Sequence, residues 1–173
     1  MSLTLAVLMA ATTTVPLTNT PVSQLDLARY AGTWHEIAHL PMFFQRKCVS
    51  DTTATYTRRA DGTVEVDNAC RTTEGKVQRS VGAAKPVTGQ PGALKVRFAP
   101  SWLGWIPGVW ADYWVIDLDP NYQWAVVGSP SQKYLWILSR SPTMGKPTFD
   151  AIITRAQRRG YDTTKLVMTS SLE

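Results

Sequence analysis

Alternating apolar and polar positions recur along most of this chain, and this period of two predicts strands. Short turn sequences separate the alternating runs, and Asp61-Gly62 is a strong hairpin signal among them. Turns of this length join strands that run antiparallel. Eight successive strands are predicted, over residues 33–40, 49–58, 63–70, 77–85, 93–99, 111–118, 123–128 and 134–140. This order favours an all-β up-and-down antiparallel barrel or a sandwich.

A different period near the carboxyl end predicts one helix. The apolar positions that recur there with helical spacing are Phe149, Ile152, Ile153 and Ala156. Pro147 suits the first turn of this helix and Gly160 suits its end. We expect the helix to lie against the barrel wall and a short strand, residues 166–169, to follow it. A run of strands followed by one helix argues against a parallel sheet.

Length and composition indicate one domain. The chain has 173 residues, of which 44% are hydrophobic, which suffices for one sizeable core. Its formal net charge of +5 favours peripheral contact with an anionic membrane. Nucleic acid is not expected as a partner, because the only tight basic cluster falls at the predicted helix end, at Arg155, Arg158 and Arg159. The sequence does not decide between a monomer and a homodimer.

The first residues differ in composition from the rest. Residues 3–11 have the length and small-residue finish of the apolar part of an export signal, without the preceding Lys or Arg, and are too short to span a bilayer. Residues 12–21 are rich in Thr and Pro and lack periodicity. We therefore expect a leader remnant and flexible tether over residues 1–24, or alternatively a disordered extension, and a barrel domain over residues 25–173.

The two cysteines, Cys48 and Cys70, flank the predicted hairpin around Asp61-Gly62. Folding this hairpin brings both to its open end, where a suitable register would allow a disulfide. An export-like leader favours the disulfide over two free thiols. No metal is expected, because two Cys and two His at these positions match no ligand spacing.

Three sequence blocks stand out along the chain, namely Gly32-Thr33-Trp34, Asp119-Pro120-Asn121-Tyr122, and Arg140 at the end of Tyr134-Leu135-Trp136-Ile137-Leu138-Ser139-Arg140. These blocks resemble the lipocalin family, and in particular its bacterial members and the related apolipoprotein D branch. The resemblance covers roughly residues 25–170. It implies an eight-stranded barrel closed at one end. We assign Gly32, Trp34, Asp119, Tyr122 and Arg140 to the closed end, with the Arg140 guanidinium over the Trp34 ring.

The resemblance also implies a location in the cell envelope, periplasmic or associated with the outer membrane. Bacterial lipocalins are often lipoproteins anchored through a Cys that follows the leader, whereas this chain has no Cys before Cys48.

Loops opposite the closed end should surround the mouth of a cup. One of them, residues 101–110, carries Trp102, Trp105 and Trp110, and Phe43 and Phe44 lie on another. Exposed apolar side chains of this kind mark a ligand, protein or membrane contact. The alternative is a lid that folds inward and fills the top of the barrel.

Strand alternation predicts which side chains line the cup. If Trp34 faces inward, Glu36 and Ala38 face inward too, while His35 and His39 face outward. Other expected ligand-binding wall residues are Tyr56, Phe98, Tyr113, Val115, Trp136 and Leu138.

Glu36 needs a hydrogen-bond partner or a raised pKa, because an unpaired buried charge is costly. Tyr56, Tyr113 and Arg140 are the candidate partners. The carboxyl group could anchor a polar ligand head, or belong to a hydrogen-bond network at the closed end; we favour the network.

These features favour a non-catalytic carrier of hydrophobic small molecules that needs no cofactor. The lipocalin resemblance implies fatty acids or lysophospholipids as ligands. One alternative is a lipid-transforming enzyme of isomerase type, although paired cysteines would remove the thiolate such chemistry uses. The other is a module that docks a membrane or protein through residues 101–110.

Overall fold

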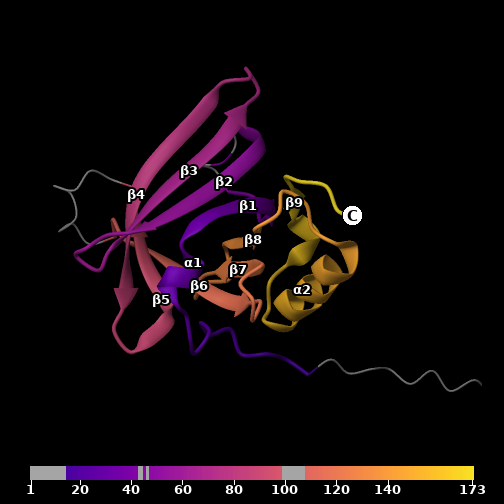
Figure 1. The fold of residues 1–173 in the computed structure, drawn as a ribbon. Coiled ribbons are helices and arrows are strands. Elements are labelled where there is room, and N and C mark those ends of the chain that lie inside the picture. Colours follow the sequence, from indigo (N-terminus) through magenta and orange to yellow (C-terminus); the bar gives the residue numbers. More distant parts are fainter. Residues whose placement is uncertain (1–14, 43–44, 46, 99–107) are drawn as a thin grey trace, which may run out of the picture.

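The computed structural model describes residues 15–42, 45, 47–98 and 108–173 (Figure 1). Nine strands form one sheet in the order β2-β3-β4-β5-β6-β7-β8-β1-β9, and the additional pairing of β1 with β2 closes the barrel. The strands are β1 (Gly32–His39), β2 (Cys48–Arg58), β3 (Val64–Thr72), β4 (Val77–Val87), β5 (Gln90–Arg97), β6 (Ala111–Leu118), β7 (Trp124–Gly128), β8 (Leu135–Ser139) and β9 (Val167–Met168). The predicted eight-stranded antiparallel barrel with one extra strand is confirmed.

Three helices accompany the barrel in the described residues. They are α1 (Leu27–Tyr30), α2 (Lys146–Arg158) and the 3-10 helix η3 (Thr163–Lys165). Helix α2 lies on the outside of the barrel (Figure 1) and buries Phe149, Ile152 and Ala156. These side chains pack with outward-facing residues such as Ile116 and Val126. The predicted C-terminal helix on the barrel wall is thus confirmed. No helix in the described part of the chain is long and apolar enough to cross a membrane.

A bulge in β1 changes which residues face inward. Glu36 pairs with Leu138, but the next register pair is Ala38 with Ile137, so one residue is inserted on β1. Ala38 therefore joins Ile137 in the cluster beneath α2, and His39 pairs with Trp136. The prediction that Ala38 faces the cup and His39 faces outward is wrong, because an inserted residue reverses the alternation beyond it.

Residues 15–24 lie along the barrel instead of forming a free tether. The Leu17 N–H donates to Arg158 O at 2.8 Å, and the Val22 N–H donates to Val115 O at 2.8 Å. Val22 O in turn accepts from the Gly92 N–H at 3.2 Å. A Cβ atom at residue 92 would lie 2.5 Å from Val22 O, so this close approach requires Gly. The backbone of this segment thus has hydrogen-bond partners on the barrel, and Val22 packs against the core inside it. Residues 1–14 of the predicted leader lie outside the described residues.

Candidate ligand-binding cavity

Trp34 and Arg140 form the closed end of the barrel. The Trp34 ring is fully buried, and the Arg140 guanidinium carbon lies 3.8 Å from its centroid. The same guanidinium donates to the backbone oxygens of Arg29 at 2.7 Å, Ala31 at 3.0 Å and Thr33 at 2.9 Å. One side chain thereby ties β8 to the entry of β1.

The other residues assigned to the closed end lie around this pair. Gly32 has a φ of +92°, which favours glycine, and a Cβ atom there would lie 3.4 Å from Arg140 Nη1. The Asp119 carboxylate accepts from the Asn121 N–H at 3.0 Å and so shapes the turn before β7. The Tyr122 hydroxyl accepts from the Asp26 N–H at 2.9 Å, which fixes the chain ahead of α1.

A chain of three tyrosine hydroxyls lies above Trp34. The Tyr113 oxygen is 2.7 Å from that of Tyr30 and 2.8 Å from that of Tyr56. The Tyr30 ring also packs on Trp34, with 5.1 Å between ring centroids. Burial raises the pKa of Tyr56 to about 12 and raises the pKa values of Tyr30 and Tyr113 well above their usual range. All three phenols are therefore neutral at physiological pH and act as hydroxyl donors and acceptors.

The described residues of the barrel enclose a cavity of about 460 Å³. Its wall contains six of the eight side chains predicted to bind ligand, namely Glu36, Tyr56, Phe98, Tyr113, Trp136 and Leu138. Two predicted wall residues do not line it. Ala38 faces outward because of the bulge, and Val115 is fully buried in the packed core inside the barrel.

The predicted mouth loops are described only in part. Phe43, Phe44, Trp102 and Trp105 lie outside the described residues. Trp110 is described. The Lys85 ammonium nitrogen lies 4.3 Å from the centroid of the Trp110 ring, and the Arg97 guanidinium carbon lies 4.8 Å from it. Both distances suit cation–π contacts.

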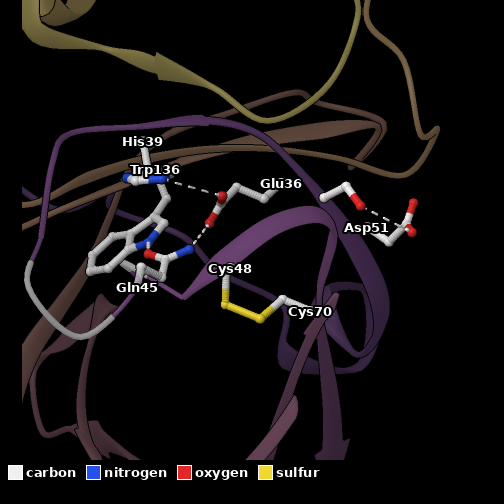
Figure 2. Close-up of a disulfide and its surroundings, with 8 residues drawn as sticks. Glu36, His39, Gln45, Cys48, Asp51, Cys70 and Trp136 are labelled. Atoms are coloured by element: carbon white, nitrogen blue, oxygen red, sulfur yellow. Dashed lines mark hydrogen bonds and ion pairs between the residues drawn. A yellow bond between two sulfur atoms is a disulfide. The ribbon is translucent and has the colours of Figure 1, made fainter. Parts of the chain in front are cut away.

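Glu36 belongs to a polar cluster with His39, Gln45 and Trp136 (Figure 2). Its Oε2 atom accepts from Gln45 Nε2 at 2.6 Å, and Gln45 Oε1 accepts from Trp136 Nε1 at 3.1 Å. Its Oε1 atom lies 3.9 Å from His39 Nε2 and has no hydrogen-bond partner among the described residues. The expected partners, Tyr56, Tyr113 and Arg140, are therefore wrong.

The electrostatic setting of Glu36 is that of a desolvated acid. Burial raises its pKa above the ordinary value of 4.5, and the nearby His39 ring and the Gln45 hydrogen bond offset only part of this rise. His39 Nδ1 lies 2.7 Å from Leu40 O. Because a carbonyl oxygen only accepts, Nδ1 must carry the hydrogen of this bond. In neutral His39 the Nε2 atom therefore carries no proton and faces the acid.

Sequence reasoning missed several wall residues. Thr52 and Asn68 line the cavity, and each is in phase with a wall residue of its own strand, Tyr56 and Val66 respectively, so alternation could have identified them. Gln45 lies in the connection between β1 and β2 and carries no sequence signal for its role.

The predicted disulfide between Cys48 and Cys70 is confirmed, with 5.5 Å between the two Cα atoms. Both residues line the cavity, and Figure 2 shows the bond beside Gln45. The chain has no other cysteine, so no free thiol is present. Among the described residues, no three His, Cys, Asp or Glu side chains gather closely enough to hold a metal ion.

The family model and the relatives similar in sequence indicate one family, and a solved structure shares its fold. The family model described as a lipocalin-like domain matches residues 25–171. Temperature-induced lipocalin-1 of Arabidopsis thaliana is 43% identical over 151 residues, which cover 86% of this chain and 80% of that protein. The outer membrane lipoprotein Blc of Escherichia coli strain K12 is 39% identical over 157 residues, covering 89% and 84% respectively. Among solved structures, insecticyanin from the tobacco hornworm Manduca sexta has a TM-score of 0.68 at 22% identity, covering 92% of this chain and 87% of that one.

Proposed function

We propose that this chain, which belongs to the lipocalin family and shares its capacity to bind small hydrophobic molecules, carries fatty acids or lysophospholipids in the cell envelope. The observation that carries the proposal is the cavity of about 460 Å³ above a packed floor. This volume falls within the range of about 300–1,000 Å³ that is typical of small-molecule sites.

The chemistry of the wall supports a lipid chain as the occupant. Val66, Val96, Val127 and Leu138 supply aliphatic surface, and Phe98 and Trp136 supply aromatic surface. Such surface gains about 25 cal/mol for each Å² that a ligand removes from water. Most of the surface that the wall exposes to the cavity is apolar, which is the usual composition of a site for a hydrophobic ligand.

The location in the envelope is supported by the relatives named outer membrane lipoprotein, and contact with an anionic membrane is supported by the net charge of +5. A carrier is favoured over an enzyme because both cysteines are engaged in the disulfide, which withholds the thiolate that the isomerase alternative needs.

A binding titration with a matched pair of variants tests the proposal. Ala54 lines the cavity, whereas Thr57 on the same strand is exposed on the outside. We expect wild type and Thr57→Trp to bind a fluorescent fatty acid saturably. Ala54→Trp should lose at least about tenfold in affinity, since the indole fills ligand space. A wild-type protein that binds neither this probe nor any lipid in a screen would contradict the proposed function.

A further inference from the structure

Three oxygen atoms in the cavity wall lack hydrogen-bond partners. Glu36 Oε1, Thr52 Oγ1 and Asn68 Oδ1 are buried and unpaired among the described residues. They come from β1, β2 and β3, three successive strands of the barrel wall, and all three residues line the same cavity. Asn68 pairs with Ala54, and Ala54 pairs with Trp34, so these strands are adjacent at this level.

Leaving such atoms unpaired is costly. A buried polar group without a partner costs about 1–3 kcal/mol, so most buried polar groups in native proteins are paired. The last torsions of Glu and Asn side chains are broad, so rotation can turn Glu36 Oε1 and Asn68 Oδ1 to the cavity surface. A hydrogen-bond donor in the cavity would then satisfy them.

The charges of the wall disfavour an anionic group at this position. Arg79 is the one cationic side chain among the described residues that line the cavity, and it is already bonded to the Asp67 carboxylate. The acidic wall residues are Glu36 and Asp112. A carboxylate or phosphate has no hydrogen to donate at neutral pH and would face oxygen atoms instead of a free cation.

The tyrosine chain supplies a complementary donor. Tyr30, Tyr113 and Tyr56 have three O–H groups but form only two hydrogen bonds among themselves, so one hydrogen stays unused. When Tyr30 donates to Tyr113, the unused hydrogen belongs to Tyr113 or to Tyr56, the two members that line the cavity.

We propose that Glu36, Thr52 and Asn68 form a subsite for the hydroxyl groups of a neutral lipid head. A hydroxyl carries one hydrogen and two acceptor lone pairs, so each hydroxyl of the head can donate to one wall oxygen while it accepts a hydrogen from a tyrosine, which neither a carboxylate nor a hydrocarbon can do. The inference rests on the proposed lipid-binding function and narrows it at this one position of the wall, where a hydroxyl-bearing head is preferred to the carboxylate of a fatty acid.

Three lipids with the same acyl chain test the subsite by displacement of a fluorescent fatty acid at neutral pH. The lipids are 1-oleoylglycerol, which has two hydroxyls, methyl oleate, which has none, and oleic acid, which is anionic. We expect 1-oleoylglycerol to bind wild type about threefold to tenfold more tightly than methyl oleate, the gain from one net hydrogen bond or slightly more. Oleic acid should gain nothing over methyl oleate from this subsite.

Two variants of matched shape locate the effect. Thr52→Val and Asn68→Leu remove unpaired oxygens, so both proteins should be at least as stable as wild type in urea denaturation. Each should bind methyl oleate as before and lose most of the preference for 1-oleoylglycerol. Thr57→Val, on the outer face of the same strand as Thr52, should keep the preference.

The outcomes separate the two proposals. Equal binding of 1-oleoylglycerol and methyl oleate by wild type, or a preference that survives in both cavity variants, overturns the hydroxyl subsite while leaving lipid binding intact. Failure of the fluorescent fatty acid and of all three lipids to bind wild type overturns the proposed function, and the subsite with it.

Discussion

The Arg140 guanidinium carbon lies 3.8 Å above the centroid of the Trp34 ring, although these residues come from opposite halves of the chain. The contact joins the end of β8 to the start of β1, and these two strands pair in the closed barrel. The guanidinium also donates hydrogen bonds to backbone oxygens of residues just before β1 and at its start. Closure therefore depends on the shape of this side chain as well as on its charge.

Replacing Arg140 should test that dependence. We expect Arg140→Ala to lower the free energy of unfolding by about 2–4 kcal/mol, since it removes the cation–π contact and leaves carbonyl oxygens without their donor. Arg140→Lys should recover only part of this loss, because an ammonium cannot serve several oxygens in the guanidinium geometry. Urea denaturation measures both values, and a Lys variant as stable as wild type would show that charge alone suffices.

The tyrosine chain predicts an unequal cost for two similar substitutions. Tyr113 forms two of its hydrogen bonds and Tyr56 forms one. Tyr113→Phe should therefore cost about 1–3 kcal/mol, and roughly twice as much as Tyr56→Phe, because it leaves two buried hydroxyls without their shared partner. Thermal and urea unfolding of the two variants compare these costs. Equal losses would contradict the central position of Tyr113.

Glu36 predicts a pH dependence of stability. Its pKa is raised in the folded protein, chiefly by burial, above the ordinary value of 4.5. The folded state therefore holds this proton more tightly than the unfolded state, and the resulting stability is present below the ordinary pKa and is lost as pH rises through the folded pKa. His39, Gln45 and Thr169 each lower the Glu36 pKa, but they reduce the rise caused by burial without reversing it.

The Glu36→Gln variant should not lose this stability as pH rises, because it has no carboxyl group to ionise at this position. Its free energy of unfolding relative to wild type should increase as pH rises from about 4 to 7, as expected when an acid with a raised pKa is removed. Denaturation curves at several pH values measure the difference. A difference between the two proteins that is constant across this range would contradict a raised Glu36 pKa.

Because the β1 bulge turns Ala38 away from the cavity, a substitution there should change stability without changing ligand affinity. Because Ala38 is fully buried in the cluster beneath α2, Ala38→Leu should overpack that cluster and cost about 1–3 kcal/mol. Ligand affinity should stay near the wild-type value, since residue 38 does not line the cavity. A variant of unchanged stability with weakened fatty-acid binding would instead place residue 38 inside the barrel.

Local sequence pattern determined the strands, the helix and the ends of the barrel. Alternation predicted a strand over residues 111–118, which is observed as Ala111–Leu118, and helical spacing placed Phe149, Ile152 and Ala156 on the buried face of α2. The lipocalin resemblance placed Trp34 and Arg140 at the closed end, and the hairpin between Cys48 and Cys70 together with the export-like leader predicted their disulfide.

The tertiary structure decided the details of the site. β1 is buried on both faces beyond Glu36, since α2 covers its outer side, so hydrophobicity there could not reveal the bulge that turns Ala38 outward and His39 inward. Gln45 meets Glu36 and Trp136 only because the barrel closes, and residues 15–24 find backbone partners only on the finished barrel. Alternation is a local property of a strand, whereas register, bulges and polar partners depend on contacts between segments that are distant in sequence.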